Sequence, residues 1–201
     1  MKIKVCGMRD HQNIKALDEI REIDFIGHIF TKNSPRFIGG NQLKSHLPSF
    51  GVFVNSPKHE IENAASEYRL NYIQLHGDES PEFSKSINES VKPVVKVFAI
   101  SDKQDFKKTR DYEDCCAYFL FDTKTKLRGG SGEKFNWNFI NEYKGKTPFF
   151  LSGGISSGDV QAIKEIQHPL FFGIDINSRF ETKPGLKNIE EINLFVKELK
   201  S

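Results

Sequence analysis

Short apolar runs alternate with amphipathic stretches along this chain of 201 residues. Runs such as 94–98 and 169–174 are almost continuously apolar, which is typical of strands buried on both faces of a parallel sheet. The pattern therefore predicts an α/β protein. The candidate strands are residues 3–6, 24–30, 50–54, 72–76, 93–99, 118–122, 148–152 and 170–175.

Helix signals lie between these apolar runs. Apolar residues recur there at spacings of three and four, which puts one apolar stripe on each helix. Ser80 and Asn188 are suited to cap the starts of two helices, and Pro81 suits a first helical position. The periodic pattern covers residues 14–20, 61–68, 160–166 and 189–199.

Three connecting segments carry weaker helix signals. Segments 41–47 and 136–145 are shorter but compatible with helices. Segment 101–113 has only Phe106 as a clear apolar anchor among many charged residues. We therefore expect the fifth helix to be short or missing.

Eight alternations of strand and helix in a chain of this length match a single (β/α)8 TIM barrel, a closed parallel barrel ringed by helices. We expect one domain over residues 1–201, because no linker or low-complexity tract interrupts the pattern. An open doubly wound sheet is the alternative. That fold favours a G-x-G-x-x-G turn after the first strand, and residues 6–10 read CGMRD instead.

The charge pattern limits the classes of partner. The formal net charge of +2 comes from intermixed acidic and basic residues, so no long-range field is built that would attract nucleic acid. No apolar stretch approaches the roughly 20 residues of a membrane span, and no signal-peptide pattern precedes the first run. We expect neither a nucleic-acid nor a membrane partner, and a cytoplasmic location.

The three cysteines fit a reducing compartment. They cannot all pair within one chain, and the adjacent Cys115 and Cys116 are poor disulfide partners. The six histidines are scattered, and neither C-x-x-C nor H-x-x-x-H occurs, so a zinc site has little support. We expect no metal and no other cofactor.

Polar residues and glycines collect where the predicted strands end, which is where a barrel of this kind carries its chemistry. Cys6 ends the first run and Asp122 ends the sixth. A thiol and a carboxyl group are thus expected to meet over the barrel mouth, equipped to move protons on a small substrate. The whole set is Cys6, Arg36, Asn55, His76, Asp122, Gly153, Gly154, Asp175, Asn177 and Ser178.

Seven segments in register carry recognisable short motifs. They are 4–8 (KVCGM), 34–36 (SPR), 51–55 (GVFVN), 74–78 (QLHGD), 121–123 (FDT) with 129–132 (GGSG), 151–155 (LSGGI) and 175–178 (DINS). Together, over residues 3 to about 188, they resemble the signatures of the phosphoribosylanthranilate isomerase family, which acts in tryptophan biosynthesis and belongs to the ribulose-phosphate-binding barrels.

This resemblance implies an Amadori rearrangement of N-(5-phosphoribosyl)anthranilate to 1-(2-carboxyphenylamino)-1-deoxyribulose 5-phosphate. It makes Asp122 the acid that protonates the furanose ring oxygen and Cys6 the base that removes the C2 proton. For these roles Asp122 must keep its proton near neutrality, while the pKa of Cys6 must fall toward ambient pH. We therefore expect their environments to act in opposite directions.

The resemblance also implies roles in substrate binding. Arg36 is expected to bind the anthranilate carboxylate, since a guanidinium fork matches a planar carboxylate. Gly153-Gly154 and Asn177-Ser178 follow the seventh and eighth strands and are expected to hold the phosphate on backbone amides.

Asp175 is expected to orient a sugar hydroxyl or its loop, from an inward strand face shared with Phe171. Residues 129–132 are interpreted as a mobile flap. Arg179 departs from the glycine that is usual after Ser178 in this family. It either contacts the phosphate or reflects a different backbone geometry.

Two inward positions leave alternatives open. Lys4 either stabilises a Cys6 thiolate or, as we favour, pairs with a buried carboxylate. His76 either helps to hold the substrate or is a structural histidine. Other functions are an indole-glycerol-phosphate synthase-like enzyme, a lysine-imine lyase, and a barrel that binds a phosphosugar without turnover. The sequence permits a monomer or a homodimer.

Overall fold

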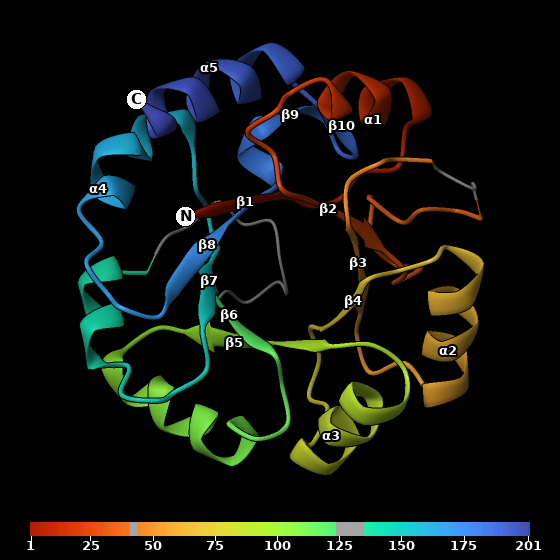
Figure 1. Cartoon of the computed structure of the whole chain (residues 1–201), viewed down its shortest axis with the longest axis vertical. Coiled ribbons are helices and arrows are strands. Elements are labelled where there is room, and N and C mark those ends of the chain that lie inside the picture. The colour runs from red at the N-terminus through yellow and green to blue at the C-terminus, as the bar shows by residue number, and fades with distance from the viewer. Residues whose placement is uncertain (41–43, 124–134) are drawn as a thin grey trace.

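The computed structural model describes residues 1–40, 44–123 and 135–201. Eight strands form a closed parallel barrel in chain order, and pairing of β1 with β8 closes the ring (Figure 1). The predicted TIM barrel is confirmed, and the open-sheet alternative is wrong. The strands are β1 (Lys2–Val5), β2 (Phe25–Ile29), β3 (Ser49–Phe53), β4 (Tyr72–Leu75), β5 (Val94–Ile100), β6 (Tyr118–Thr123), β7 (Phe149–Leu151) and β8 (Phe171–Ile176).

Helices surround the barrel, with α5 lying beside α4 and α1 (Figure 1). Two of the predicted caps are present: the Ser80 hydroxyl accepts the N–H of Phe83, and the Asn188 side chain accepts the N–H of Glu191. The α-helices are α1 (His11–Asp18), α2 (Lys58–Glu67), α3 (Pro81–Ser90), α4 (Val160–Lys164) and α5 (Ile189–Lys200).

Segment 101–113 forms no α-helix, as expected for the fifth helix, and folds instead as the ten-residue 3-10 helix η1 (Lys103–Tyr112). The Asp105 carboxylate accepts backbone N–H groups of Ser101 and Asp102, and the Phe106 ring packs on the Phe121 ring at 4.9 Å. One capping carboxylate and two aromatic rings therefore replace the apolar stripe of an α-helix: Phe106, and Tyr112, whose ring packs on the Phe98 ring at 5.3 Å.

The other two weak segments also differ from α-helices. Segment 136–145 contains the 3-10 helix η2 (Trp137–Glu142). Residues 44–47 form no helix, and 41–43 lie outside the described residues. Beyond β7 and β8 the chain also forms elements that were not predicted. These are η3 (Ser157–Asp159), η4 (Ser178–Phe180) and the antiparallel pair β9 (Glu181–Lys183) and β10 (Leu186–Lys187).

Aromatic rings fill the amino-terminal end of the barrel interior. The register of β7 with β8 shifts so that Phe149 pairs with Phe171 and Phe150 pairs with Gly173. This shift turns Phe172 inward, whereas Phe171 packs on the outer core, so the prediction of an inward Phe171 is wrong. The rings of this barrel floor are Phe25, Phe50, Tyr72, Tyr118, Phe150 and Phe172.

A second apolar core lies between the strands and the helices. It includes Ile3 of β1, Ile174 of β8 and Leu199 of α5. Among the described residues, no helix is both long and apolar enough to cross a membrane.

Candidate active site

A cavity of about 290 Å³ opens at the carboxyl ends of the strands. All nine residues to which we assign catalytic or binding roles line it, so side chains from six strand ends and their loops meet in one place. They are Cys6, Arg36, His76, Asp122, Gly153, Gly154, Asp175, Asn177 and Ser178.

Lys4 lies at the base of this cavity and is fully buried. Its ammonium group donates to Asp175 Oδ2 at 3.0 Å and to Gln74 Oε1 at 2.9 Å, and it lies 5.1 Å from the centroid of the Phe50 ring. Burial opposes its charge, but attraction to Asp175 and Cys6 outweighs burial and raises the pKa of Lys4. Lys4 thus pairs with a buried carboxylate and also faces the thiol.

Cys6 is only 4% exposed, and its backbone N–H donates to the carbonyl of Ile176. Burial raises the pKa of the thiol, and the opposing charges of Lys4 and Lys187 do not overcome it. The expectation of a lowered thiol pKa is therefore wrong for the structure without substrate. The physical reason is desolvation, which disfavours the thiolate in a closed barrel.

Gly27 of β2 makes room for this arrangement. A side chain at Gly27 would begin 2.9 Å from Cys6 Sγ and 3.2 Å from Lys4 Cε. Any larger residue would displace the thiol or the ammonium group. The sequence alone does not reveal the role of Gly27, because a glycine within a strand does not show which side chains approach it.

The two carboxylate oxygens of Asp122 have different neighbours, one in the backbone and one in the cavity. Its Oδ1 accepts the N–H of Thr123 at 2.8 Å, and its Oδ2 lies 3.5 Å from Nε2 of His76. The other ring nitrogen of His76, Nδ1, is 3.3 Å from Nε2 of Gln74. One carboxylate oxygen is therefore anchored while the other faces the imidazole.

Arg36 is held by a carboxylate that sequence analysis did not identify. Its Nε and Nη2 donate to the Glu181 carboxylate at 2.7 to 3.0 Å. Lys187 donates to the same carboxylate at 2.7 Å and to Asn177 Oδ1 at 2.6 Å. Burial opposes the charge of Glu181, yet Arg36 and Lys187 hold its pKa below the ordinary value.

Lys187 is itself buried, and burial lowers its pKa despite the attraction of Glu181. Glu181 and Lys187 lie on β9 and β10, between β8 and the last helix. Apolar periodicity gives no signal for a buried ion pair in such a short hairpin. Only the folded chain shows that these residues support Arg36 and Asn177.

The two glycines after β7 suit an anion. Gly153 and Gly154 have φ values of +90° and +69°, which side chains disfavour, and an added side chain at Gly153 would meet Thr123 and Asp122. Among residues 1–40, 44–123 and 135–201, neither glycine N–H donates a hydrogen bond. Within the described residues, both amides are therefore left for a ligand.

Asp175 has an unused acceptor. Its Oδ1 is buried and, within the described part of the chain, accepts no hydrogen bond, while Oδ2 is taken by Lys4. A buried lone oxygen is costly unless a ligand completes it. This geometry suits a donor such as a sugar hydroxyl.

Other sequence expectations fall outside the cavity. Asn55 does not line it; its φ is +51° and its side chain accepts the N–H of Asp78. Arg179 is exposed on η4 and does not line the cavity, and its φ is not positive. The segment 129–132 lies outside the described residues.

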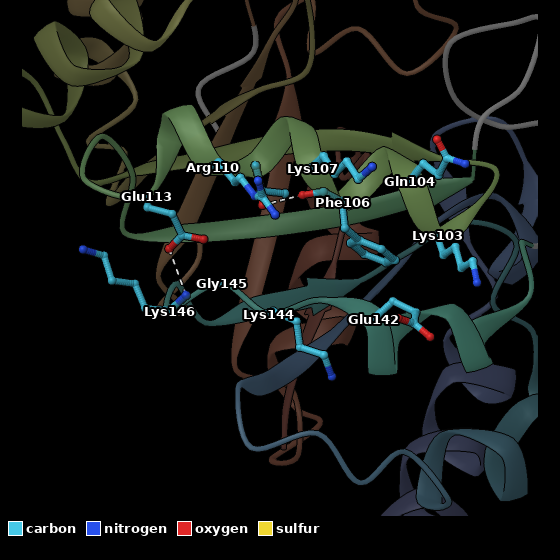
Figure 2. A pocket seen from close by; sticks show the side chains of 11 residues that line it. Lys103, Gln104, Phe106, Lys107, Arg110, Glu113, Glu142, Lys144, Gly145 and Lys146 are labelled. Carbon is cyan, nitrogen blue, oxygen red and sulfur yellow. Dashed lines mark hydrogen bonds between the residues drawn. The ribbon is translucent and has the colours of Figure 1, made fainter.

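A larger cleft, of about 640 Å³, lies between η1 and η2 on the outside of the barrel (Figure 2). Its basic residues include Lys103, Lys107 and Arg110. Glu113 in this cleft is already used, because it accepts N–H groups of Lys146 and Thr147. The cleft therefore offers charge but no evident acid and base pair.

In the part of the chain that is described, no group of three or more His, Cys, Asp or Glu side chains is arranged to hold a metal ion. The three cysteines, including Cys115 and Cys116, are all free thiols.

The closed parallel barrel with its polar cavity at the carboxyl ends of the strands defines the class of TIM-barrel enzymes. Residues 3–198 match the family model described as N-(5'phosphoribosyl)anthranilate (PRA) isomerase. The chain belongs to this family, as the sequence resemblance predicted.

Similar proteins agree with this membership. The chain is 44% identical over 207 residues to N-(5'-phosphoribosyl)anthranilate isomerase of Parabacteroides distasonis, which covers 99% of this chain and 93% of that protein. The crystal structure of phosphoribosyl anthranilate isomerase from Thermotoga maritima is 30% identical, with a TM-score of 0.86 over 100% of this chain and 98% of that one.

A further similar structure contains a ligand. It is a phosphoribosyl anthranilate isomerase in complex with reduced 1-(o-carboxyphenylamino)-1-deoxyribulose 5-phosphate, 26% identical, with a TM-score of 0.82. The match covers 100% of this chain and 98% of that chain.

Proposed function

We propose that this chain converts N-(5-phosphoribosyl)anthranilate into 1-(2-carboxyphenylamino)-1-deoxyribulose 5-phosphate in tryptophan biosynthesis, with Asp122 as general acid and Cys6 as general base. The observation that carries this proposal is the single cavity that gathers the thiol, the carboxyl group, an arginine and two glycine amides that bond to none of the described residues. Each matches one part of this substrate: a C2 proton, a ring oxygen, a carboxylate and a phosphate.

The reaction begins at the ring oxygen. Asp122 gives its proton from Oδ2 to that oxygen, the bond from C1 to the ring oxygen breaks, and the anilino nitrogen supplies the electrons that form an iminium ion. The Cys6 thiolate then removes the C2 proton to give an enolamine. Water then supplies a proton to C1 and takes the hydroxyl proton from O2 to yield the ketose, and proton exchange with water returns Asp122 to its acid form and Cys6 to the thiolate.

Binding groups hold the substrate for these steps. We assign the phosphate to Gly153-Gly154 and Asn177-Ser178, and the anthranilate carboxylate to Arg36. Asp175 Oδ1 is assigned to a sugar hydroxyl, because that buried oxygen has no donor in the described chain. Since the base must be a free thiol, the proposal requires a reducing compartment such as the cytoplasm.

The test is decay of the fluorescence of freshly generated phosphoribosylanthranilate on addition of purified, chelator-treated protein. Conversion without added metal supports the proposal. A protein that binds the reduced product analogue but gives no decay is instead a phosphosugar-binding barrel. Loss of turnover on chelation would contradict a mechanism that needs only side chains.

A further inference from the structure

A line of polar contacts crosses the barrel interior from Lys4 to Asp122. Lys4 Nζ lies 2.9 Å from Gln74 Oε1, Gln74 Nε2 lies 3.3 Å from His76 Nδ1, and His76 Nε2 lies 3.5 Å from Asp122 Oδ2. Gln74 and His76 are two residues apart on β4 and its end, so both face inward. The donor and the acceptor in each of these contacts can be assigned in turn, beginning at Lys4.

Lys4 determines how the Gln74 amide is turned. An ammonium group has only donors, so the amide must direct its oxygen toward Lys4 and its NH2 group toward His76. Gln74 is 1% exposed and Lys4 is fully buried, so water does not offer the amide another partner. The positive charge of Lys4 therefore determines the orientation of the Gln74 amide.

The amide in turn determines which ring nitrogen of His76 carries the proton. Nδ1 faces an NH2 donor and must accept, so in the neutral ring the proton resides on Nε2. Nε2–H then faces Asp122 Oδ2.

We propose that Gln74 is a positioning residue that, held by Lys4, fixes His76 as the Nε2–H tautomer, so that the imidazole presents an N–H group toward Asp122 Oδ2, 3.5 Å away. The consequence for catalysis rests on the proposed function. As Asp122 releases its proton, negative charge develops on a carboxylate whose Oδ1 is already bound by Thr123 N–H. A donor at Oδ2 stabilises that charge, whereas the other tautomer would direct a lone pair at it.

The first test is the tautomer in the wild-type protein. Two-bond ¹H–¹⁵N correlation spectra of the histidine-labelled chain at neutral pH distinguish the two neutral tautomers from imidazolium, and a His76→Asn sample assigns the signals of His76. A neutral ring with the proton on Nε2 supports the inference. A proton on Nδ1, or a doubly protonated ring, overturns it.

The second test reverses the contact with Gln74→Glu. A carboxylate at this position still accepts from Lys4 but cannot donate, so Nδ1 of His76 must acquire a proton. We expect His76 signals to change state and kcat to fall roughly tenfold to hundredfold, the range for a hydrogen bond to a charged group. KM and the affinity for the reduced product analogue should change less than about threefold.

Two further variants complete the design. Gln74→Met keeps the side-chain length but removes both polar contacts, so the tautomers should mix and kcat should fall less than in Gln74→Glu. Gln161→Glu, an exposed position on α4, is the matched control and should leave both spectra and kcat unchanged. A Gln74→Glu variant that switches tautomer but keeps the wild-type kcat overturns the catalytic role.

The two proposals fail in different ways. Absence of turnover in the wild-type protein contradicts the proposed function, while the wild-type spectrum still decides the tautomer. Normal wild-type turnover with an Nδ1–H ring contradicts only the inference about Gln74.

Discussion

The two ends of the barrel interior use the same strands for opposite purposes. On β4, Tyr72 belongs to the aromatic floor, and His76 at the end of this strand lines the cavity. On β6, Tyr118 packs in the floor, and Asp122 faces the cavity. A shift of four residues along one strand face thus changes the environment from stacked rings to paired charges.

The physical difference lies in what burial costs. Phe150 is completely buried against rings such as Phe25 and Tyr118, so removing it from water is favourable. Lys4 and Asp175 are buried equally deeply but only as a pair, since a lone buried charge is costly. We therefore expect the aromatic floor to stabilise the fold, and the buried reactive groups at the barrel mouth to lower its stability.

The largest expected effect is on turnover at the mouth. We expect Cys6→Ser and Asp122→Asn each to lower kcat by roughly two to four powers of ten, since each removes a proton-transfer group. Steady-state kinetics measures this, and thermal unfolding of the same samples should show little change. The double variant is the control, and wild-type turnover in it would reject the acid and base assignment.

A substitution in the aromatic floor should instead lower stability and leave turnover nearly unchanged. Phe150→Ala is expected to lower the free energy of unfolding by about 3–5 kcal/mol, because it leaves a cavity among packed rings. Denaturant titration measures the loss. At a temperature where the variant remains folded, kcat should stay close to wild type; a fall as large as that of Asp122→Asn would mean that the two ends are not separable.

A smaller effect is expected on binding. Arg36→Ala should weaken affinity for the reduced product analogue roughly tenfold to hundredfold, the range for hydrogen bonds to charged groups. Arg36→Lys keeps the charge but loses the fork and should recover only part of the affinity. Calorimetry checks both variants. Equal affinities in wild type and Arg36→Ala would show that Arg36 does not bind the ligand.

The smallest expected effect is a pH dependence. Because burial raises the pKa of Cys6, the reactive thiolate becomes more abundant as pH rises through that raised value. We therefore expect kcat/KM to increase from neutral into alkaline solution, with a midpoint above the roughly 8.5 of a free thiol. A profile that is already flat at neutral pH would show that substrate-free Cys6 is ionised.

Much of the fold could be predicted from local pattern. Apolar runs bounded by polar strand ends identify all eight strands, and capping residues such as Ser80 and Asn188 locate two helix starts. η1 escaped this pattern because Asp105 caps it and the rings of Phe106 and Tyr112 anchor it. Two such rings among charged residues do not make the three- and four-residue spacing of an apolar stripe.

The candidate site likewise has residues that the sequence could predict and residues that it could not. Strand-end positions located nine of the residues that line the cavity, because parallel strands in a barrel all end at one mouth, although the same rule also selected Asn55, which does not line it. Glu181, Lys187 and Gly27 were missed, since their importance depends on contacts with residues distant in sequence. The raised pKa of Cys6 was also missed, because residue type does not reveal the extent of burial.

The sequence by itself determined the alternation of elements, the closed barrel and the chemical groups at its mouth, because these follow from local periodicity and from which residue ends each strand. Tertiary structure alone decided which of those groups form ion pairs and hydrogen bonds with one another. Lys4 meets Asp175 and Gln74, and Arg36 meets Glu181, only when the barrel closes. Burial and electrostatic pairing are properties of distance in space, which no local pattern contains.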